Sequence, residues 1–287
     1  IFCFKKLQTM KVVYFAANFM NIISVQSLDH PSLLPYRTMR QPVEHWRQGI
    51  FIAEGERVVR RLVESTTEII SFLLSQEWWE IYQPLLLQRA QQPNKIFIAD
   101  NSLLEAIVGF RLHQGIMAIA KIPPMQTREE NFSSHSLFVA LDGIANAENM
   151  GVIVRNCSAF GVESIIVGET SCSPYLRRAV RNSMGAIYTM NIFHSENLVN
   201  DLHFLRDNGT SIIAAHPQPF AKEIQNEIFG EKLCIVFGSE GNGISQPVLD
   251  VCTQIVQIPM QNNTDSLNVA SATAVMLWEI VRRNLLQ

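Results

Sequence analysis

The sequence predicts a protein of the α/β class, in which a small α/β domain is followed by a larger domain built on a mostly parallel sheet. In both parts of the chain, short apolar runs alternate with segments of helical period, which is typical of strands that alternate with covering helices. Between the two parts, residues 122–135 (IPPMQTREENFSSH) combine two prolines with serine, asparagine and charge, without a hydrophobic period. This stretch is interpreted as a linker.

Composition narrows the class of protein. With 287 residues, of which 47% are hydrophobic, the chain is long enough to form two domains with a core each. A net charge of −3 argues against a broad, non-specific nucleic-acid surface, so any RNA contact is expected to be local. No apolar run reaches the ~18–20 residues of a membrane helix. The five cysteines lack CxxC spacing and the seven histidines lack ligand spacing, so we expect a cytoplasmic protein without a metal site.

The first part of the chain, residues 29–121, is predicted to form the small α/β domain. Strands are expected at 50–53, 69–74, 95–99 and 116–120, and helices at 56–63, 78–88 and 102–109. Residues 1–28 are interpreted as a disordered extension that contributes nothing to the fold. They begin with Ile1 rather than Met, and a short apolar run at 12–17 resembles a signal sequence without a cleavage site.

The second part, residues 136–287, is predicted to carry the mostly parallel sheet with helices on both faces. Strands are expected at 137–141, 163–167, 189–193, 211–214, 233–237 and 254–258, and helices at 150–160, 174–183, 195–206 and 268–284. Such alternation fits many α/β folds. The loops that follow three of these strands are more specific.

Each of these three loops combines glycine or proline with polar residues. The strand at 137–141 leads to residues 149–156 (NMGVIVRN) and then to Phe160-Gly161, and the strand at 233–237 leads to residues 238–243 (GSEGNG). The strand at 254–258 breaks at a proline into residues 258–270 (IPMQNNTDSLNVA), which open the last helix. Glycine lets a backbone approach a ligand closely, although polar residues before a helix also serve as plain caps.

In this order, the three loops resemble the three motifs of the SpoU-type (TrmH-like) RNA 2'-O-ribose methyltransferases of the SPOUT superfamily. The resemblance covers roughly residues 136–284, and a weaker resemblance to an L30e-like RNA-binding domain covers about 30–121. Two details depart from the family pattern: Ala147-Glu148 stands where Pro-Gly is usual, and Asn262 stands where Gly is frequent. The resemblance implies a knotted C-terminal domain, S-adenosylmethionine as cofactor, tRNA or rRNA as substrate, and a homodimer formed through the C-terminal domain.

The resemblance also implies a role for individual residues. The catalytic set would comprise Arg155, Asn149, Glu240, Ser266 and Asn268, and the cofactor would be held by Gly238, Ile258, Met260 and Leu267. A guanidinium does not readily lose a proton, so we expect Arg155 to stabilise the developing alkoxide and hold a phosphate rather than act as a base. A structural ion pair is a plainer explanation for the presence of Arg155. Core packing is a plainer explanation for the apolar residues of the cofactor set.

Two groups of arginines on helix faces are candidate RNA contacts: Arg57, Arg60 and Arg61, and Arg177, Arg178 and Arg181. A solvated helix face explains each group equally well.

The apolar content of the last helix exceeds what one buried face needs, which favours the homodimer.

Two other functions stay open. One is a non-catalytic RNA-binding protein on a methyltransferase scaffold. The other is a dinucleotide-binding oxidoreductase, which needs G-x-G-x-x-G after an early strand, whereas residues 238–243 fall near the end of the chain.

Overall fold

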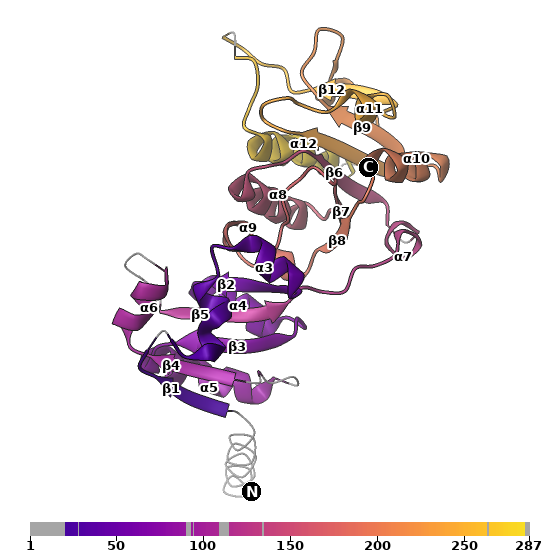
Figure 1. Cartoon of the computed structure of the whole chain (residues 1–287). Coiled ribbons are helices and arrows are strands. Elements are labelled where there is room, and N and C mark those ends of the chain that lie inside the picture. The colour runs from indigo at the N-terminus through magenta and orange to yellow at the C-terminus, as the bar shows by residue number, and fades with distance from the viewer. Residues whose placement is uncertain are drawn as a thin grey trace, which may run out of the picture. The chain divides into compact units, whose positions relative to one another are not determined.

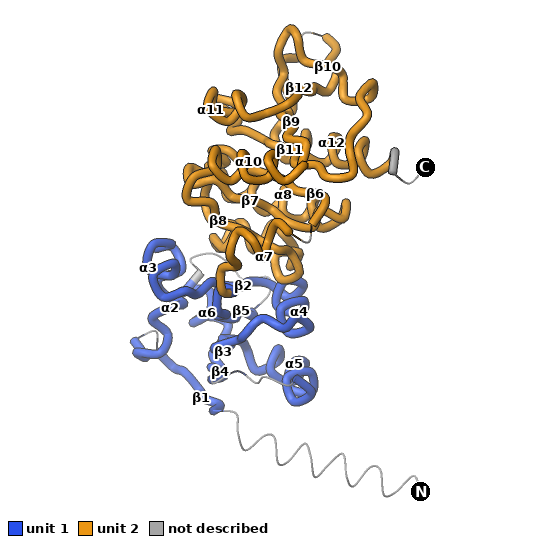
Figure 2. The backbone as a smooth tube through the Cα atoms, turned by 90° about the vertical axis from the view of Figure 1, so that its right-hand side faces the viewer, with its two compact units in different colours: residues 1–123 blue, residues 124–287 orange. Residues whose placement is uncertain are grey.

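The computed structural model describes residues 21–27, 29–89, 93, 95–108, 115–133, 135–262 and 264–284. The chain forms two compact units, residues 1–123 and residues 124–287 (Figure 2).

The first unit is built on a five-stranded mixed sheet in the order β1-β4-β3-β5-β2. Its strands are Asn21–Val25 (β1), Ile50–Glu54 (β2), Ile69–Leu74 (β3), Lys95–Ala99 (β4) and Ile116–Lys121 (β5). Its helices are Leu34–Arg37 (α2), Pro42–Arg47 (α3), Glu56–Glu64 (α4), Gln76–Gln88 (α5) and Asn101–Val108 (α6). Strands β1, β3 and β4 run parallel to one another, whereas β5 pairs antiparallel with both β2 and β3.

Strand β1 corrects the interpretation of residues 1–28 as an extension outside the fold. Asn21–Val25 pairs with β4 along its whole length, from Asn21 opposite Lys95 to Val25 opposite Ala99 (Figure 1). Val25 is 5% exposed and belongs to the hydrophobic core of this unit. The segment therefore forms an edge strand of the sheet; residues 1–20 lie outside the described residues.

The second unit is built on a seven-stranded sheet in the order β10-β12-β9-β11-β6-β7-β8, in which each pair of neighbouring strands is parallel. The strands are Leu137–Asp142 (β6), Ser164–Val167 (β7), Asn191–His194 (β8), Ser211–Ala215 (β9), Lys222–Glu223 (β10), Leu233–Gly238 (β11) and Gln254–Gln257 (β12). The prediction of an α/β fold with a mostly parallel sheet is confirmed. The two-residue strand β10 was not predicted, since so short a segment has no hydrophobic period.

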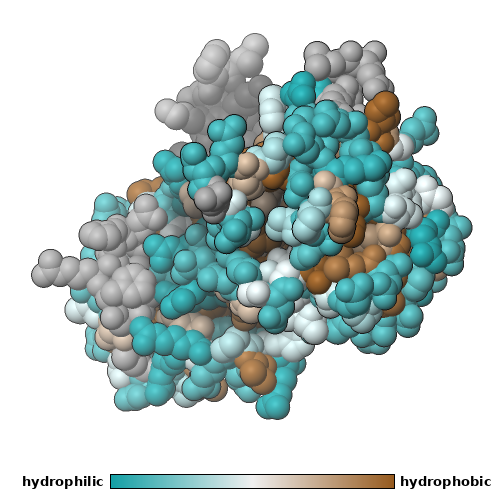
Figure 3. Space-filling view, turned by 90° about the horizontal axis from the view of Figure 1, so that it is seen from above, coloured by the Kyte–Doolittle hydropathy of each residue, from teal (hydrophilic) through white to brown (hydrophobic). Residues whose placement is uncertain are grey.

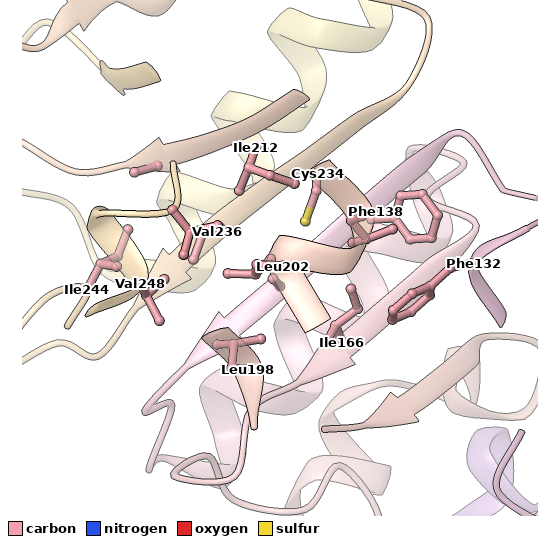
Figure 4. Close-up of a cluster of buried hydrophobic side chains, with 14 residues drawn as sticks. Phe132, Phe138, Ile166, Leu198, Leu202, Ile212, Cys234, Val236, Ile244 and Val248 are labelled. Atoms are coloured by element: carbon pink, nitrogen blue, oxygen red, sulfur yellow. The ribbon is translucent and has the colours of Figure 1, made fainter. Parts of the chain in front are cut away.

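Helices cover both faces of this sheet (Figure 1). They are Arg128–Phe132 (α7), Ala147–Ala159 (α8), Arg177–Asn182 (α9), Leu198–Asp207 (α10), Gln246–Leu249 (α11) and Val269–Asn284 (α12). On one face, α10 and residues around α11 close over Phe138, Cys234 and Val236 (Figure 4). Successive side chains of a strand point to opposite faces, so Phe237 points the other way from Val236, and it lines a cavity together with Met276 of α12. Helix α12 also packs against α8.

Helix α7 corrects the interpretation of residues 122–135 as a linker. Thr127 and Glu130 form a reciprocal capping box at its start, in which each side chain accepts a hydrogen bond from the backbone N–H of the other. At its end, Phe132 is 5% exposed and packs in the core of the second unit, edge-on to Phe138. Part of this stretch is therefore an element of the second unit.

The hydrophobic residues of both units are mainly internal, and the surface seen from above is largely hydrophilic with separate hydrophobic patches (Figure 3). The cores include two cysteines, Cys157 and Cys234, each 0% exposed. Burial raises the pKa of both thiols far above the usual range, as is typical of inert core cysteines. The exposed large hydrophobic residues of the second unit include Phe220, Ile228, Val275 and Trp278.

Candidate functional site

A cavity of about 550 Å³ opens at the carboxyl ends of three neighbouring strands, β12, β9 and β11. Its wall consists of the residues that follow these strands and of the first turns of α12. The lining comprises residues 215–217, 237–243, 257, 258, 260, 265–269, 272 and 276. In an open parallel sheet, ligands bind in this position, outside the carboxyl ends of the strands, and the volume falls in the usual range of ligand pockets.

The loop at 238–243 is a tight turn that depends on two glycines. Ser239 and Gly243 exchange backbone hydrogen bonds, 3.0 Å long in each direction. A Cβ atom on Gly238 would lie 2.2 Å from the carbonyl carbon of Gly243, and Gly243 itself has a φ of +68°. Both positions therefore need glycine so that the turn can close, and the closed turn leaves its backbone facing the cavity.

Three of the predicted polar residues meet at the cavity, although they come from three separate segments. The Asn149 side chain, on the first turn of α8, donates a hydrogen bond to Glu240 Oε1. The Asn268 side chain donates to Asn149 Oδ1 over 3.1 Å. Glu240 and Asn268 line the cavity directly, and Asn149 reaches it through these two bonds. The network joins all three loops that the sequence singles out.

Local capping explains how Asn149 and Asn268 are held. Asn146 caps α8, because its side chain accepts hydrogen bonds from the backbone N–H groups of Glu148 and Asn149 at 2.7 and 3.2 Å. The helix consequently begins at Ala147, three residues before the expected start. Asn268 precedes α12, and its Oδ1 accepts from the N–H of Ala270 at 2.9 Å. Its cap function and its bond to Asn149 use different atoms of one amide group.

The remaining predicted cleft residues also line the cavity. Gly238 lies at the end of β11, Ile258 and Met260 follow β12, and Ser266 and Leu267 precede α12. Leu267 is 39% exposed, so its side chain is accessible rather than part of the core. Ile258, Met260 and Leu267, together with Phe237 and Met276, supply apolar side chains to the cavity lining.

Arg155 does not line this cavity. It lies eight residues after the start of α8, is exposed, and makes no hydrogen bond or ion pair with the described residues. Gly151, one turn earlier, lies where a Cβ atom would be 2.3 Å from the carbonyl oxygen of Ala179 in α9. The motif glycine therefore allows α8 and α9 to pack closely, and Arg155 emerges from the same helix at the surface.

The two arginine groups lie in different units. On α4, Arg60 forms a 2.6 Å ion pair with Glu56 and its guanidinium lies 5.8 Å from the centre of the Tyr82 ring, whereas Arg57 and Arg61 are exposed. On α9, Arg178 is exposed and lies 3.8 Å from Glu148, and Arg181 is also exposed while Arg177 is partly buried. Helix α9 packs on α8, the helix that carries Arg155.

The structure also adds residues that the sequence did not single out. His216 and Asp265 line the cavity, and with Glu240 they are its ionisable residues. The signal for His216 was its position two residues after the strand expected at 211–214. Among the residues described, no three His, Cys, Asp or Glu side chains are grouped so as to hold a metal ion, and none of the helices there is long and apolar enough to cross a membrane.

Known proteins with similar sequences and structures point to one family. A family model described as the SpoU rRNA Methylase family matches residues 136–278. A 23S rRNA (guanosine-2'-O-)-methyltransferase RlmB of Vibrio vulnificus is 31% identical over 184 residues, which cover 60% of this chain and 72% of the relative. An uncharacterized tRNA/rRNA methyltransferase of Mycobacterium bovis is 28% identical over 262 residues, covering 88% of this chain and 90% of the relative.

Solved structures show the same fold along most of the chain. An AdoMet-bound rRNA methyltransferase from Sinorhizobium meliloti has a TM-score of 0.80 at 22% identity and covers 93% of this chain and 99% of its own. A structure titled RNA 2'-O ribose methyltransferase has a TM-score of 0.75 at 22% identity and covers 92% of this chain and 99% of its own.

A parallel sheet whose strand ends and glycine-rich turn enclose a mixed polar and apolar cleft is typical of α/β proteins that bind a nucleotide-like ligand. Within that class, the chain belongs to the SpoU rRNA methylase family. The prediction of an RNA methyltransferase that uses S-adenosylmethionine is thereby confirmed.

Proposed function

We propose that the protein transfers a methyl group from S-adenosylmethionine to the ribose 2'-hydroxyl of a nucleotide in tRNA or rRNA. The observation that carries this proposal is the Asn149–Glu240–Asn268 network, which joins all three motif loops at the mouth of one cavity. The Vibrio relative, whose name specifies 2'-O-methylation of 23S rRNA, and the mycobacterial relative, named a tRNA/rRNA methyltransferase, support the reaction and both substrate classes.

The residues of the cavity fit the cofactor. Gly238 has no side chain to obstruct the turn at 238–243, so its backbone stays available to hydroxyl and amino groups. The apolar side chains of Ile258, Met260 and Leu267 suit a flat heterocycle. When bound, S-adenosylmethionine supplies a methyl group on a positively charged sulfur. Of the described residues that line the cavity, the charged ones are carboxylates, which favours a cationic ligand.

The polar side chains act on the ribose and its proton. Because a guanidinium keeps its proton and presents a planar fork of donors, Arg155 can hold the developing 2'-alkoxide and an adjacent phosphate oxygen together. Glu240 and Asn268, oriented by Asn149, fix the nucleotide against the cleft. Ser266, exposed at the cavity rim, offers a hydroxyl to the same nucleotide. Stabilising the alkoxide lowers the barrier in proportion to the charge that develops there.

Arg155 needs a second subunit to reach such a site, because it is exposed on α8 and does not line the cavity of its own chain. We infer a homodimer formed through α8 and α12. On α12, Val275 and Trp278 are 42% and 53% exposed, and the Trp278 ring lies 6.4 Å from that of Phe160, just after α8. This apolar surface adjoins the helix of Arg155 and suits a two-fold interface.

The proposal also concerns the fold and RNA contacts of the first unit and the path of the chain in the second unit. We infer that the first unit has the L30e-like fold implied by the sequence and that exposed Arg57 and Arg61 of α4, together with Arg178 and Arg181 of α9, contact RNA phosphates. We also infer that the segments following β11 are threaded as a trefoil knot, as the resemblance implies. The cytoplasmic location expected from the cysteines stays a prediction.

Mapping of ribose methylation tests the function. RNA from a strain that lacks the gene is compared by mass spectrometry with RNA from its parent and from a strain complemented with the wild-type gene. We expect one 2'-O-methylated nucleotide to disappear in the deletion strain and to return on complementation. Complementation with Arg155→Ala should not restore it. Unchanged methylation of both tRNA and rRNA in all strains would favour the non-catalytic RNA-binding alternative.

A further inference from the structure

His216 lines the cavity at the carboxyl end of the middle one of its three strands. It follows β9, the strand between β12 and β11, and its backbone N–H donates to the carbonyl of Val256 over 3.0 Å. The sheet register places Ala215 opposite Phe237 on one side and Val256 on the other. One residue further along, His216 therefore stands level with Gly238 and Gln257, which both line the cavity.

The glycine at 243 leaves the space that the imidazole ring fills. A Cβ atom on Gly243 would lie 2.8 Å from Cε1 and 3.1 Å from Nδ1 of His216. The ring is thus packed directly against the backbone of the turn. Its two nitrogens make no hydrogen bond or ion pair with any residue that the structure describes. A half-buried imidazole that is held in place and has both nitrogens available is suited to bind a ligand.

We propose that His216 is a cofactor-binding residue that exchanges a hydrogen bond with S-adenosylmethionine. The proposal rests on the proposed function in one respect, namely that the cavity binds this cofactor. The two ring nitrogens of an imidazole can exchange hydrogen bonds with the hydroxyl and amino groups of the cofactor.

Glu240 and Asp265 are the other ionisable residues among the described lining. The demethylated product keeps the hydroxyl and amino groups of S-adenosylmethionine and lacks only the charged methylsulfonium, so a hydrogen bond from His216 should contribute to the binding of both ligands.

Calorimetric titration of the full-length protein with both ligands tests the proposal. We expect His216→Ala to weaken binding of S-adenosylmethionine by about fivefold to tenfold, the equivalent of one lost hydrogen bond. His216→Gln keeps a hydrogen-bond donor and an acceptor, so it should recover part of the affinity. His203→Ala, on α10 away from the cavity, is the matched control and should bind like the wild type.

A double-mutant cycle tests whether Gly243 acts through His216. An alanine at 243 displaces the ring, so Gly243→Ala should cost less affinity in the His216→Ala background than in the wild type. Melting temperatures show whether each variant is folded. If the wild type binds S-adenosylmethionine while folded His216→Ala binds it equally well, the role of His216 is disproved and the cofactor assignment stands. If the wild type binds neither ligand, the cofactor assignment itself fails.

Discussion

The glycines of the motif loops serve the packing of the protein itself before they serve any ligand. At Gly151 the missing side chain lets α8 approach the carbonyl of Ala179 in α9, and at Gly238 it lets the turn at 238–243 close on its own backbone. Gly238 was predicted to hold the cofactor, whereas Gly151 lies in the segment that carries Asn149 and Arg155. The first effect of both glycines is to fix the helix of Asn149 and the turn of Glu240 in the positions that the polar network requires.

The packing role of Gly151 can be measured. Replacing it with alanine puts a methyl group 2.3 Å from the Ala179 carbonyl oxygen, which must push α8 and α9 apart. We expect Gly151→Ala to lower the free energy of unfolding by about 1–3 kcal/mol, as measured by urea denaturation. Gly241, where an added Cβ atom meets nothing within 4 Å, is the matched control. An equal change in both variants would contradict the role of Gly151.

The role proposed for Arg155 separates chemistry from binding. Because the proposed interaction with the alkoxide would exist mainly after the proton begins to leave, Arg155→Ala should lower the single-turnover rate by about 100-fold to 1000-fold. Cofactor affinity and melting temperature should hardly change, since the side chain is exposed and lies outside the cavity. Arg155→Lys should restore little, because an ammonium cannot bridge two oxygens as the guanidinium does.

A structural ion pair at Arg155 would give a different pattern. Thermal stability would then fall, and activity would follow the fraction of folded protein. A folded Arg155→Ala variant of nearly normal rate would exclude Arg155 from the reaction.

Most residues of the cleft could be predicted from sequence because each lies directly after a strand or before a helix. Gly238, Ile258 and Asn268 are such cases. His216 escaped prediction because histidines were considered only as metal ligands, at spacings along the sequence. Its function depends on which strands are neighbours, and the order β12-β9-β11 is a property of the sheet rather than of any one segment.

At the level of elements, the edge strand β1 shows where prediction of secondary structure from the local sequence fails. Its sequence, NIISV, is short, and its partner β4 lies about 70 residues further along the chain. An edge strand is recognised by the strand beside it, which local composition does not identify. Helix α7, by contrast, had a recognisable signal in Thr127 and Glu130, the two residues of its capping box, which the polar composition of the segment obscured.

The contribution of β1 can be tested with two substitutions in the same strand. Val25 is 5% exposed and packs in the core, whereas Ile22 is 44% exposed. We expect Val25→Ala to destabilise the first unit by about 1–3 kcal/mol, and Ile22→Ala by about 0.5 kcal/mol or less. Chemical denaturation monitored by circular dichroism measures both. If Val25→Ala is as stable as the wild type, β1 contributes nothing to the fold.

At the level of the whole molecule, the α/β class and the parallel sheet followed from the alternation of strands and helices. The order of the strands did not, because parallel strands of similar composition can be arranged in several ways. In the second unit, β6 pairs with β11 and β7, and β9 separates β11 from β12. Those neighbours decide which loops share a cavity and leave Arg155 outside it.

The proposed homodimer can be tested by mixing two inactive variants. Arg155→Ala keeps an intact cleft, and Asn268→Ala keeps an intact arginine. If Arg155 acts on the cleft of the partner, each mixed dimer has one complete site. With random exchange of subunits, the mixture should recover about a quarter of wild-type activity. A mixture no more active than its parents would show that Arg155 acts within its own chain. Trp278→Glu, at an exposed position on α12, should give a folded, inactive monomer by light scattering.

The pairing of β6 with β11 also determines when the protein can mature during translation. Leu137 begins β6, and its partner Leu233 is synthesised nearly a hundred residues later. Until then, the edge of β6 that pairs with β11 stays unpaired. A chain with such an unpaired apolar strand folds slowly and is prone to aggregate. Residues up to 123 can meanwhile fold as a unit of their own. The nascent chain thus acquires the first unit early, and the cleft takes shape only as the last helix leaves the ribosome.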